Sequence, residues 1–197
     1  MTFVLGLTGS VGMGKSATAA LFAAQGLPVW DAVAAVHRLY AAGGAAVAVI
    51  TALFPAAVVN GSVSRPALRA VIAANPAALA RIERVVHPLV AQDRADFLRR
   101  QTATIVVLDI PLLYETGADA QCDAIAVVST SADIQRARVM ARPGMTKAAF
   151  ALILSRQLPD ADKRARADYV IDTTTPETAQ ADVAAIIQSI NTGLLHA

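Results

Sequence analysis

Residues 3–16 combine an apolar segment with a glycine-rich loop, and their sequence is FVLGLTGSVGMGKS. The spacing from Gly9 to Gly14, Lys15 and Ser16 fits the pattern G-x-x-x-x-G-K-[ST], in which backbone N–H groups surround the phosphates of a nucleotide. In that pattern the lysine reaches the β- and γ-phosphate oxygens, and the serine hydroxyl binds Mg²⁺. Glycines allow positive φ and close approach to an anion. The alternative is an ordinary glycine-rich turn that opens a helix.

The segments on either side of the loop decide between these interpretations. A short apolar run precedes the loop, as expected of a buried strand, and residues 16–25 have a helical composition with Gly26 as a stop signal. Such a helix directs the positive end of its dipole at the phosphates. Strand, loop and helix agree, so the sequence predicts a phosphate-binding loop.

Length and composition set the broad class of the protein. The chain has 197 residues, enough for one domain with a small inserted lobe. Apolar residues make up 55%, yet no uninterrupted apolar run reaches the roughly 18 residues that cross a bilayer. The N-terminus lacks the features of a signal peptide. We therefore expect a soluble cytoplasmic protein without a membrane partner. Cys122 is the only cysteine, which excludes an intrachain disulfide and a cysteine-based metal site.

Strand-like and helix-like segments alternate along the chain, which predicts an α/β fold. The strand candidates are apolar runs without strict alternation, as expected for a parallel sheet covered on both faces. Strands are predicted at residues 3–8, 28–31, 104–110, 123–129 and 169–172. Helices are predicted at residues 15–25, 33–41, 44–53, 65–74, 76–100, 131–141, 146–156, 160–167 and 176–191. Residues 33–100 contain no convincing strand, so we expect a helical lobe inserted between the second and third strands.

Basic side chains gather in one stretch, although the formal net charge is only +2. They are Arg136, Arg138, Arg142, Lys147, Arg156, Lys163, Arg164 and Arg166. This stretch could form a solvated helical face, a weak nucleic-acid patch or a cationic cover over a polyphosphate. The phosphate-binding loop favours the cover. No aromatic residues alternate with the arginines, so base stacking has no support and we expect no nucleic-acid partner.

Three aspartates end predicted strands, where ligands of open α/β sheets bind. They are Asp31, Asp109 and Asp172. Asp109 follows a run of apolar residues, as a Walker B acid near Mg²⁺ does, but it could equally cap the next turn. Asp31 could orient an attacking hydroxyl or accept its proton, or it could be a turn residue before a helix.

Several further motifs resemble one family. GLTGSVGMGKS, Asp31-Ala32, His87-Pro88-Leu89, DIPLLYE from Asp109 and ADYVI from Ala167 occur in the order found in dephospho-coenzyme A kinases. The match spans nearly the whole chain. The resemblance implies a P-loop kinase that uses ATP and Mg²⁺ to phosphorylate the ribose 3′-hydroxyl of dephospho-coenzyme A, the last step of coenzyme A synthesis. It also implies a P-loop NTPase-like three-layer fold with a five-stranded parallel sheet, a helical substrate lobe and a basic lid.

The resemblance implies a domain plan and a role for each matching residue. The plan is one kinase domain, residues 1–197, with a core of about 1–32, 102–135 and 167–197, a coenzyme A-side lobe of about 33–101 and a lid of about 136–166. The expected phosphate-binding residues are Gly9, Gly12, Met13, Gly14, Lys15, Ser16 and Ala17. The expected catalytic residues are Lys15, Asp31, Arg138 and Arg142. Arg65, Arg69 and His87 are expected on the dephospho-coenzyme A side, and Ser16 and Asp109 at the metal. Arg65 and Arg69 share a helix face at i, i+4, which equally fits a solvated face. His87, which precedes a proline, could instead cap a bend.

Two positions depart from the family pattern. The family usually has Asp-Ala-Asp after the second strand, and the second aspartate is the favoured base, whereas this chain has Val33 there. Either Asp31 takes that role, or activity is low, or the base is not essential, because phosphoryl transfer depends mainly on positioning and charge stabilisation. Where the family often has Asn-x-Gly near the adenine, this chain has Asp172-Thr173-Thr174.

Other functions remain open from the residues alone. The loop does not specify the acceptor, so a kinase for a nucleoside or small alcohol is the first alternative. A regulatory nucleotide-binding module or a catalytically weak paralogue is the second. A GTPase should carry an [NT]-K-x-D element, which the sequence around Lys147 lacks. A nucleic-acid-binding role rests only on the basic isoelectric point. No sequence feature indicates the oligomeric state.

Overall fold

The computed structural model describes residues 2–195 and contains one five-stranded sheet with the order β2-β5-β1-β6-β7. The strands are β1 (Phe3–Thr8), β2 (Val29–Asp31), β5 (Ile105–Asp109), β6 (Ala124–Ser129) and β7 (Tyr169–Asp172). β1 pairs in parallel with both β5 and β6, and β6 pairs in parallel with β7. The predicted α/β class and five-stranded sheet are confirmed.

The chain divides into two compact units, unit 1 with residues 1–29 and 101–197, and unit 2 with residues 30–100. Unit 1 contains the helices α1 (Lys15–Ala24), α6 (Ala132–Met140), α7 (Lys147–Leu154), α8 (Asp160–Ala165) and α9 (Pro176–Leu195), with the 3₁₀ helix η2 (Ala118–Gln121). Unit 2 contains α2 (Ala32–Tyr40), α3 (Ala45–Leu53), α4 (Arg65–Ala74), α5 (Ala77–Arg99), the 3₁₀ helix η1 (Pro55–Ala57) and the strands β3 (Val58–Val59) and β4 (Ser62–Val63). The predicted boundary of the lobe, residue 33, lies just after the start of unit 2.

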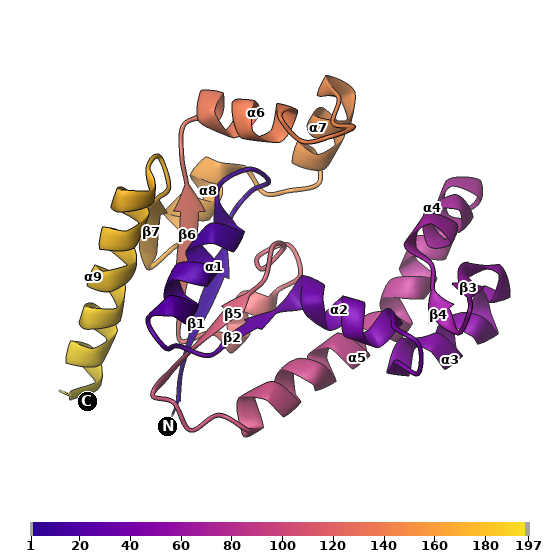
Figure 1. Ribbon diagram of the computed structural model, residues 1–197, viewed down its shortest axis with the longest axis horizontal. Helices are drawn as coiled ribbons and strands as arrows, with labels where there is room; N and C mark the ends of the chain where they lie inside the picture. Colours follow the sequence, from indigo (N-terminus) through magenta and orange to yellow (C-terminus); the bar gives the residue numbers. More distant parts are fainter. Residues whose placement is uncertain (1, 196–197) are drawn as a thin grey trace. The chain divides into compact units, whose positions relative to one another are not determined.

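The core of unit 1 lies between the central strands and the helices α1 and α9, and Figure 1 shows α9 running along β7. α9 faces the sheet because its apolar residues recur at helical spacing. They are Ala179, Val183, Ile186 and Ile190, all buried in the same cluster as Leu5, Leu7 and Phe22. Pro176 begins the helix, where its missing N–H costs nothing.

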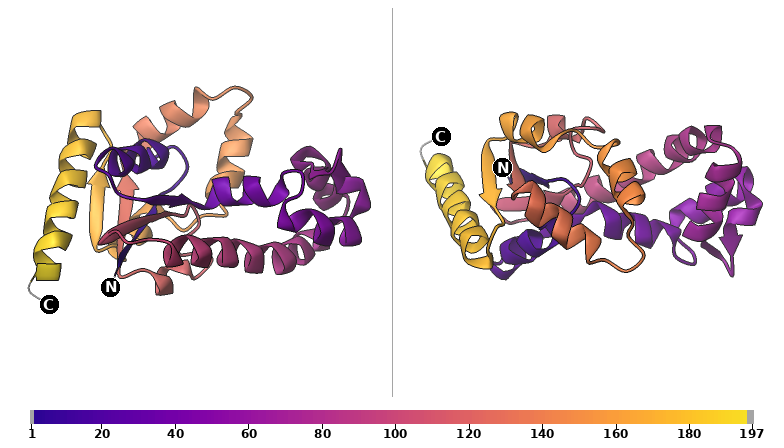
Figure 2. Two further views of the ribbon diagram at one scale, coloured as in Figure 1. Left: turned by 60° about the horizontal axis from the view of Figure 1, so that its bottom comes forward. Right: turned by 90° about the horizontal axis from the view of Figure 1, so that it is seen from above.

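Unit 2 has a core of its own. Its buried apolar residues are Ile50, Ala57, Val63, Leu68, Ile82 and Val86. They come from α3, η1, β4, α4 and α5, which group around one end of the long α5 (Figure 2). Ser64 caps α4 by accepting a hydrogen bond from the N–H of Ala67 at 3.3 Å. Each unit therefore buries a separate hydrophobic cluster.

The sequence analysis missed the two strands of unit 2, since it predicted no strand between residues 33 and 100, and it did not predict the 3₁₀ helix η1. β3 and β4 form a short antiparallel hairpin with Val58 opposite Val63. Asn60 and Gly61 connect them with φ of 50° and 75°. Asn-Gly between apolar residues is the strongest short-range hairpin signal, because both residues tolerate positive φ. The sequence therefore contained the information, and the expectation of an all-helical segment was wrong.

The other predicted elements agree closely with the structure. The largest difference is at α9, which runs to Leu195 rather than to residue 191. Among the residues that the structure describes, no single helix is long and apolar enough to cross a membrane; α2 and α3 reach that length and composition only as a pair bent by 68°.

Candidate active site

The glycine loop between β1 and α1 needs glycine for two separate reasons. Gly12 and Gly14 have φ of 81° and 88°, a region that is strained for residues with a Cβ. A Cβ on Gly12 would also lie 2.5 Å from Cγ2 of Val139 and 3.1 Å from the carbonyl oxygen of Gln135. α6 therefore packs directly against the loop.

The structure brings Lys15 and Asp109 together. Asp109 ends β5 next to β1, opposite Leu7 in the parallel register, and β1 leads into the loop that carries Lys15. The ammonium group of Lys15 donates a hydrogen bond to Oδ1 of Asp109, and Asp109 is only 2% exposed. This lysine and this acid thus meet at the carboxyl end of two adjacent strands, although 94 positions separate them in sequence.

Thr173 is a contact of the loop that the sequence analysis missed. Its hydroxyl donates to the carbonyl of Met13 at 2.8 Å and lies 3.2 Å from the carbonyl of Ser129. A Cβ on Gly14 would be 3.1 Å from the side chain of Thr173. The preceding Asp172 is exposed and accepts from the N–H of Thr174 at 2.8 Å, and hydrogen bonds from Thr174 lower the pKa of its carboxyl. Where this chain has Asp172-Thr173-Thr174 instead of the family's Asn-x-Gly, Thr173 therefore contacts the glycine loop and supports it.

The two predicted lid arginines lie in different surroundings. Arg138 on α6 is partly buried, and its guanidinium donates to the carbonyl of Thr173 at 2.7 Å and lies 3.4 Å from the Thr173 hydroxyl. Arg138, Thr173 and Met13 thus form a chain of contacts that ends in the glycine loop. Arg142 follows the C-terminus of α6 and is exposed.

The basic stretch is not uniformly a cationic cover, so that expectation needs correction. Lys163 is completely buried, and its ammonium group forms an ion pair of 2.8 Å with Glu115. Arg164 pairs with Asp160 at 2.8 Å on α8, and the guanidinium of Arg166 lies 5.7 Å from the centre of the Tyr114 ring. Part of the positive charge therefore serves the packing of unit 1.

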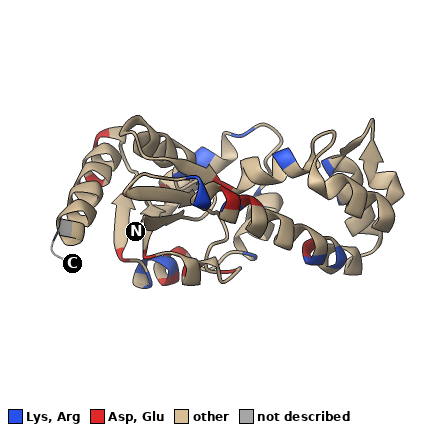
Figure 3. Cartoon of the chain, turned by 90° about the horizontal axis from the view of Figure 1, so that it is seen from below, with Lys and Arg blue, Asp and Glu red and all other residues tan. Residues whose placement is uncertain are grey.

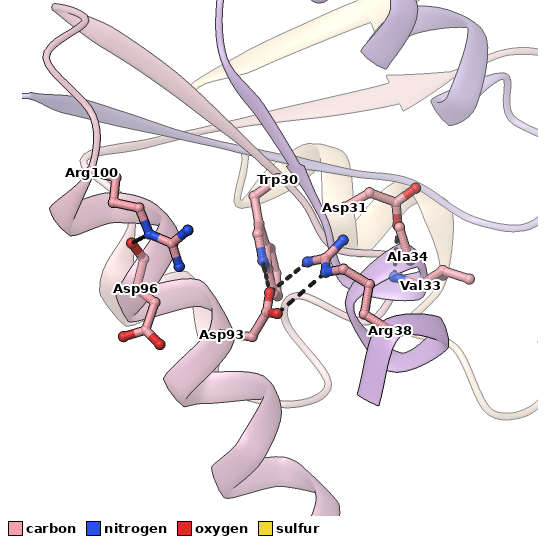
Figure 4. Close-up of polar contacts among 8 residues, drawn as sticks. All are labelled: Trp30, Asp31, Val33, Ala34, Arg38, Asp93, Asp96 and Arg100. Carbon is pink, nitrogen blue, oxygen red and sulfur yellow. Dashed lines mark hydrogen bonds and ion pairs between the residues drawn. The ribbon is translucent and has the colours of Figure 1, made fainter. Parts of the chain in front are cut away.

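Asp31 caps α2 in unit 2, which is the structural role that we considered for it. Its Oδ1 accepts from the N–H groups of Val33 at 2.7 Å and Ala34 at 3.1 Å (Figure 4). Helix N-termini favour such a side chain because their first N–H groups have no partner within the helix. Val33 itself is 44% exposed, so packing does not require an apolar side chain there.

A polar cluster next to Asp31 ties β2 and α2 to α5. The indole N–H of Trp30 donates to Oδ1 of Asp93 at 2.7 Å, and Arg38 approaches the same oxygen at 2.6 Å (Figure 4). Burial raises the pKa of the Asp93 carboxyl, but hydrogen bonds from Arg38 and Trp30 and the positive charges of Arg38 and Arg100 outweigh it. The net result is a pKa below the ordinary value of 3.8.

The residues predicted for the acceptor side all lie in unit 2 and are exposed. Arg65 and Arg69 lie on α4 and His87 on α5. Arg65 is close enough to Tyr40 to lower the pKa of that phenol, although burial has the larger effect and raises it. Lys and Arg positions occur in both units (Figure 3).

The donor atoms of the candidate site suit a hard cation. Asp109 offers carboxylate oxygens and Ser16, in the first turn of α1, offers a hydroxyl. Within residues 2–195 there is no group of three or more His, Cys, Asp or Glu side chains that could hold a metal by themselves. Mg²⁺ usually takes one or two protein oxygen ligands together with water and substrate phosphates, and Ser16 and Asp109 are donors of that kind.

Comparison with known proteins gives one consistent result. The family model described as dephospho-CoA kinase matches residues 3–178. The chain is 56% identical over 197 residues to dephospho-CoA kinase of Ruegeria pomeroyi, with 100% of both chains covered. It is 58% identical over 188 residues to that of Cereibacter sphaeroides, with 95% of each covered. The crystal structure of TT1252 from Thermus thermophilus is similar with a TM-score of 0.85 and 32% identity, over 95% of this chain and 97% of that one.

Proposed function

The chain belongs to the dephospho-CoA kinase family, and on that premise we propose that it transfers the γ-phosphoryl group of ATP to the 3′-hydroxyl of dephospho-CoA, giving CoA and ADP. The observation that carries this proposal is the extent of the match. It covers unit 2 as well as the glycine loop, so it extends to the part of the chain where acceptor residues are expected.

The glycine loop and Lys15 hold the donor in this proposal. The N–H groups of residues 12–17 surround the phosphates, and Lys15 neutralises charge on the β- and γ-phosphate oxygens as the bond to the leaving group breaks. In the structure Lys15 is paired with Asp109. A bound polyphosphate would therefore compete with that carboxylate for the ammonium group.

Mg²⁺ would be held by Ser16 and Asp109, the two oxygen donors described above, and would neutralise charge on the phosphates. Arg138 and Arg142 would supply further positive charge around the transferring group, where a planar guanidinium bonds several oxygens at once. Arg138 already has its position fixed by Thr173.

The acceptor would lie on the side of unit 2. Asp31 would orient the 3′-hydroxyl through the carboxylate, whose Oδ1 also caps α2. Arg65, Arg69 and His87 would bind the acidic pyrophosphate part of dephospho-CoA, since exposed cations attract such groups. The two roles of Asp31 are compatible, because a carboxylate has several acceptor sites.

A coupled assay of ADP release tests this function. Dephospho-CoA should support turnover, whereas a panel of nucleosides and small alcohols should not, and the product should gain one phosphoryl group by mass spectrometry. Lys15→Ala, which removes the donor-side cation, is the control for contaminating kinases. Turnover with another acceptor but not with dephospho-CoA would overturn the proposal.

A further inference from the structure

Both polar backbone groups of Val11, within the glycine loop, are bound by glutamine side chains from distant parts of unit 1. The N–H of Val11 donates to Oε1 of Gln157 at 3.1 Å. The carbonyl of Val11 accepts from Nε2 of Gln135 at 2.8 Å. Because these groups belong to the two peptide planes on either side of the Val11 Cα, the contacts restrain both φ and ψ of this residue.

The restraint lies immediately before the turn that receives phosphate. Gly12 follows with φ of 81°, and α6 packs against it through Val139 and Gln135. Residues 12–17 are those proposed above to surround the phosphates with their N–H groups. Gln135 and Gln157 therefore bind the loop at Val11, outside residues 12–17. The two glutamines thus leave the N–H groups of residues 12–17 available to a ligand.

Gln135 is buried and Gln157 is partly buried. Gln135 is 7% exposed on α6. Gln157 lies between α7 and α8, and the next residue, Leu158, donates its N–H to Glu115 at 2.8 Å. Glu115 in turn forms the ion pair with the buried Lys163. The backbone next to Gln157 is thus anchored by a chain of contacts that ends in the interior of unit 1.

We propose that Gln135 and Gln157 are positioning residues that hold the glycine loop in its phosphate-receiving conformation and couple it to residues 131–163. Gln135 and Arg138 lie three positions apart on α6, on the same side of the helix. Displacement of α6 would therefore move Arg138 and release the Val11 carbonyl together. This inference rests on the proposed ATP-dependent function, because it assigns the loop a nucleotide to receive.

The two contacts have opposite polarity, which makes a matched pair of substitutions informative. Gln157→Glu keeps an oxygen that accepts from the Val11 N–H, whereas Gln135→Glu replaces a donor by an oxygen facing the Val11 carbonyl. Each adds one negative charge beside the loop, so repulsion of ATP is common to both. Gln180→Glu, at an exposed glutamine on α9, controls for the charge alone.

The measurement is the Kd for ATP and for ADP by calorimetry, with the thermal midpoint recorded without nucleotide. We expect Gln135→Glu to weaken nucleotide binding about 10-fold more than Gln157→Glu, as expected for one lost hydrogen bond. Gln135→Met and Gln157→Met should each weaken binding, and the double variant should show less than the sum of their effects, because both restrain one residue. If the Gln135→Glu variant does not fold, the Gln135→Met variant serves as the test instead, since methionine fills a volume similar to that of glutamine.

The outcomes separate this inference from the proposed function. Equal Kd values for the wild type and the methionine variants, with only the thermal midpoint lowered, would show a purely structural role and overturn the inference. Normal ATP binding by the wild type without phosphorylation of dephospho-CoA would overturn the function and leave the Kd comparison intact.

Discussion

At the scale of the residue, Asp31 has an observed structural role and a proposed chemical one. Its Oδ1 caps α2, which by itself accounts for an aspartate at the end of β2. The neighbouring Val33 is exposed in the first turn of α2, where the helix dipole favours a carboxylate. The fold therefore tolerates either residue at position 33, and only chemistry distinguishes them.

Asp31→Asn should lower kcat while leaving the thermal midpoint nearly unchanged. Asparagine caps a helix as well as aspartate does but cannot accept the hydroxyl proton. Steady-state kinetics with dephospho-CoA and a melting curve measure the two effects. Asp31→Ala is the comparison, since loss of the cap costs about 0.5–2 kcal/mol of stability. Unchanged kcat in Asp31→Asn would assign this residue to the cap alone.

Val33→Asp should raise kcat. A general base is worth ~10²-fold at the low end, and a loose transition state with late proton transfer reduces that gain. Val59→Asp, at another exposed valine of unit 2, controls for added charge. In the Asp31→Asn background, Val33→Asp should restore part of the lost activity. If Val33→Asp and Asp31→Asn both leave kcat unchanged, neither carboxylate position contributes to the chemistry.

Lys15→Ala should lower kcat at least ~100-fold, because it removes a fixed cation from the phosphate oxygens. It should also lower stability, since it takes the cationic partner from the buried Asp109. Adding Asp109→Asn should recover stability but not activity. Melting curves and single-turnover rates separate the two effects, and a fully active Lys15→Ala variant would contradict the kinase mechanism.

At the scale of the element, Glu115 ties residues 158 and 163 to the segment that follows β5, within unit 1. This carboxylate follows β5, accepts from the N–H of Leu158 and pairs with Lys163 of α8. Burial raises the pKa of the Glu115 carboxyl, but the contacts with Lys163 and Leu158 outweigh it, so the pKa lies below its ordinary value of 4.5. One ionised carboxylate therefore helps to anchor the connection between α7 and α8.

This lowered pKa predicts a pH dependence of stability. A carboxyl with a depressed pKa contributes stability above its unfolded value of 4.5 and loses it as the pH falls through the lower folded value. Stability should therefore decrease below about pH 4.5, as urea denaturation at several pH values would measure. Glu115→Gln should flatten this decrease. An identical pH profile in Glu115→Gln would assign the acid sensitivity to other groups, such as Asp93.

At the scale of the whole molecule, each unit buries a separate apolar cluster. Leu5 and Phe22 belong to that of unit 1, and Ile50 and Leu68 to that of unit 2. The glycine loop, Asp109, Arg138 and Arg142 all lie in unit 1, and the predicted acceptor residues lie in unit 2. The residues proposed for the donor in unit 1 and those proposed for the acceptor in unit 2 thus belong to units with different hydrophobic cores.

Ile50→Ala should lower the stability of unit 2 by about 2–5 kcal/mol, because it leaves a cavity in that core. Leu5→Ala should have a similar cost in unit 1, since both side chains are fully buried. Calorimetry below the melting temperature should show ATP affinity unchanged in Ile50→Ala and reduced in Leu5→Ala. Equal losses of ATP affinity would show that the loop depends on both cores.

The sequence by itself determined the features that depend on short-range pattern. The glycine loop, its flanking strand and helix, the five parallel strands and nearly all helix bounds follow from apolar spacing and from glycine and proline signals. The hairpin at Asn60 and Gly61 is also a feature of short-range pattern, although the sequence analysis did not use its Asn-Gly signal. The sequence placed Asp31 correctly at the end of a strand. A structural role before the next helix was one of the two interpretations of this residue, beside a catalytic one.

Only the tertiary structure decided which distant residues meet. The strand order β2-β5-β1-β6-β7 puts Asp109 beside β1 and so beside Lys15. It also puts Thr173 against Met13, and the packing of α6 to α8 brings Gln135 and Gln157 to Val11 and buries Lys163. Periodicity reports which face of an element is buried but not which element covers it. The partners of a polar side chain are therefore settled only when the sheet and its helices pack together.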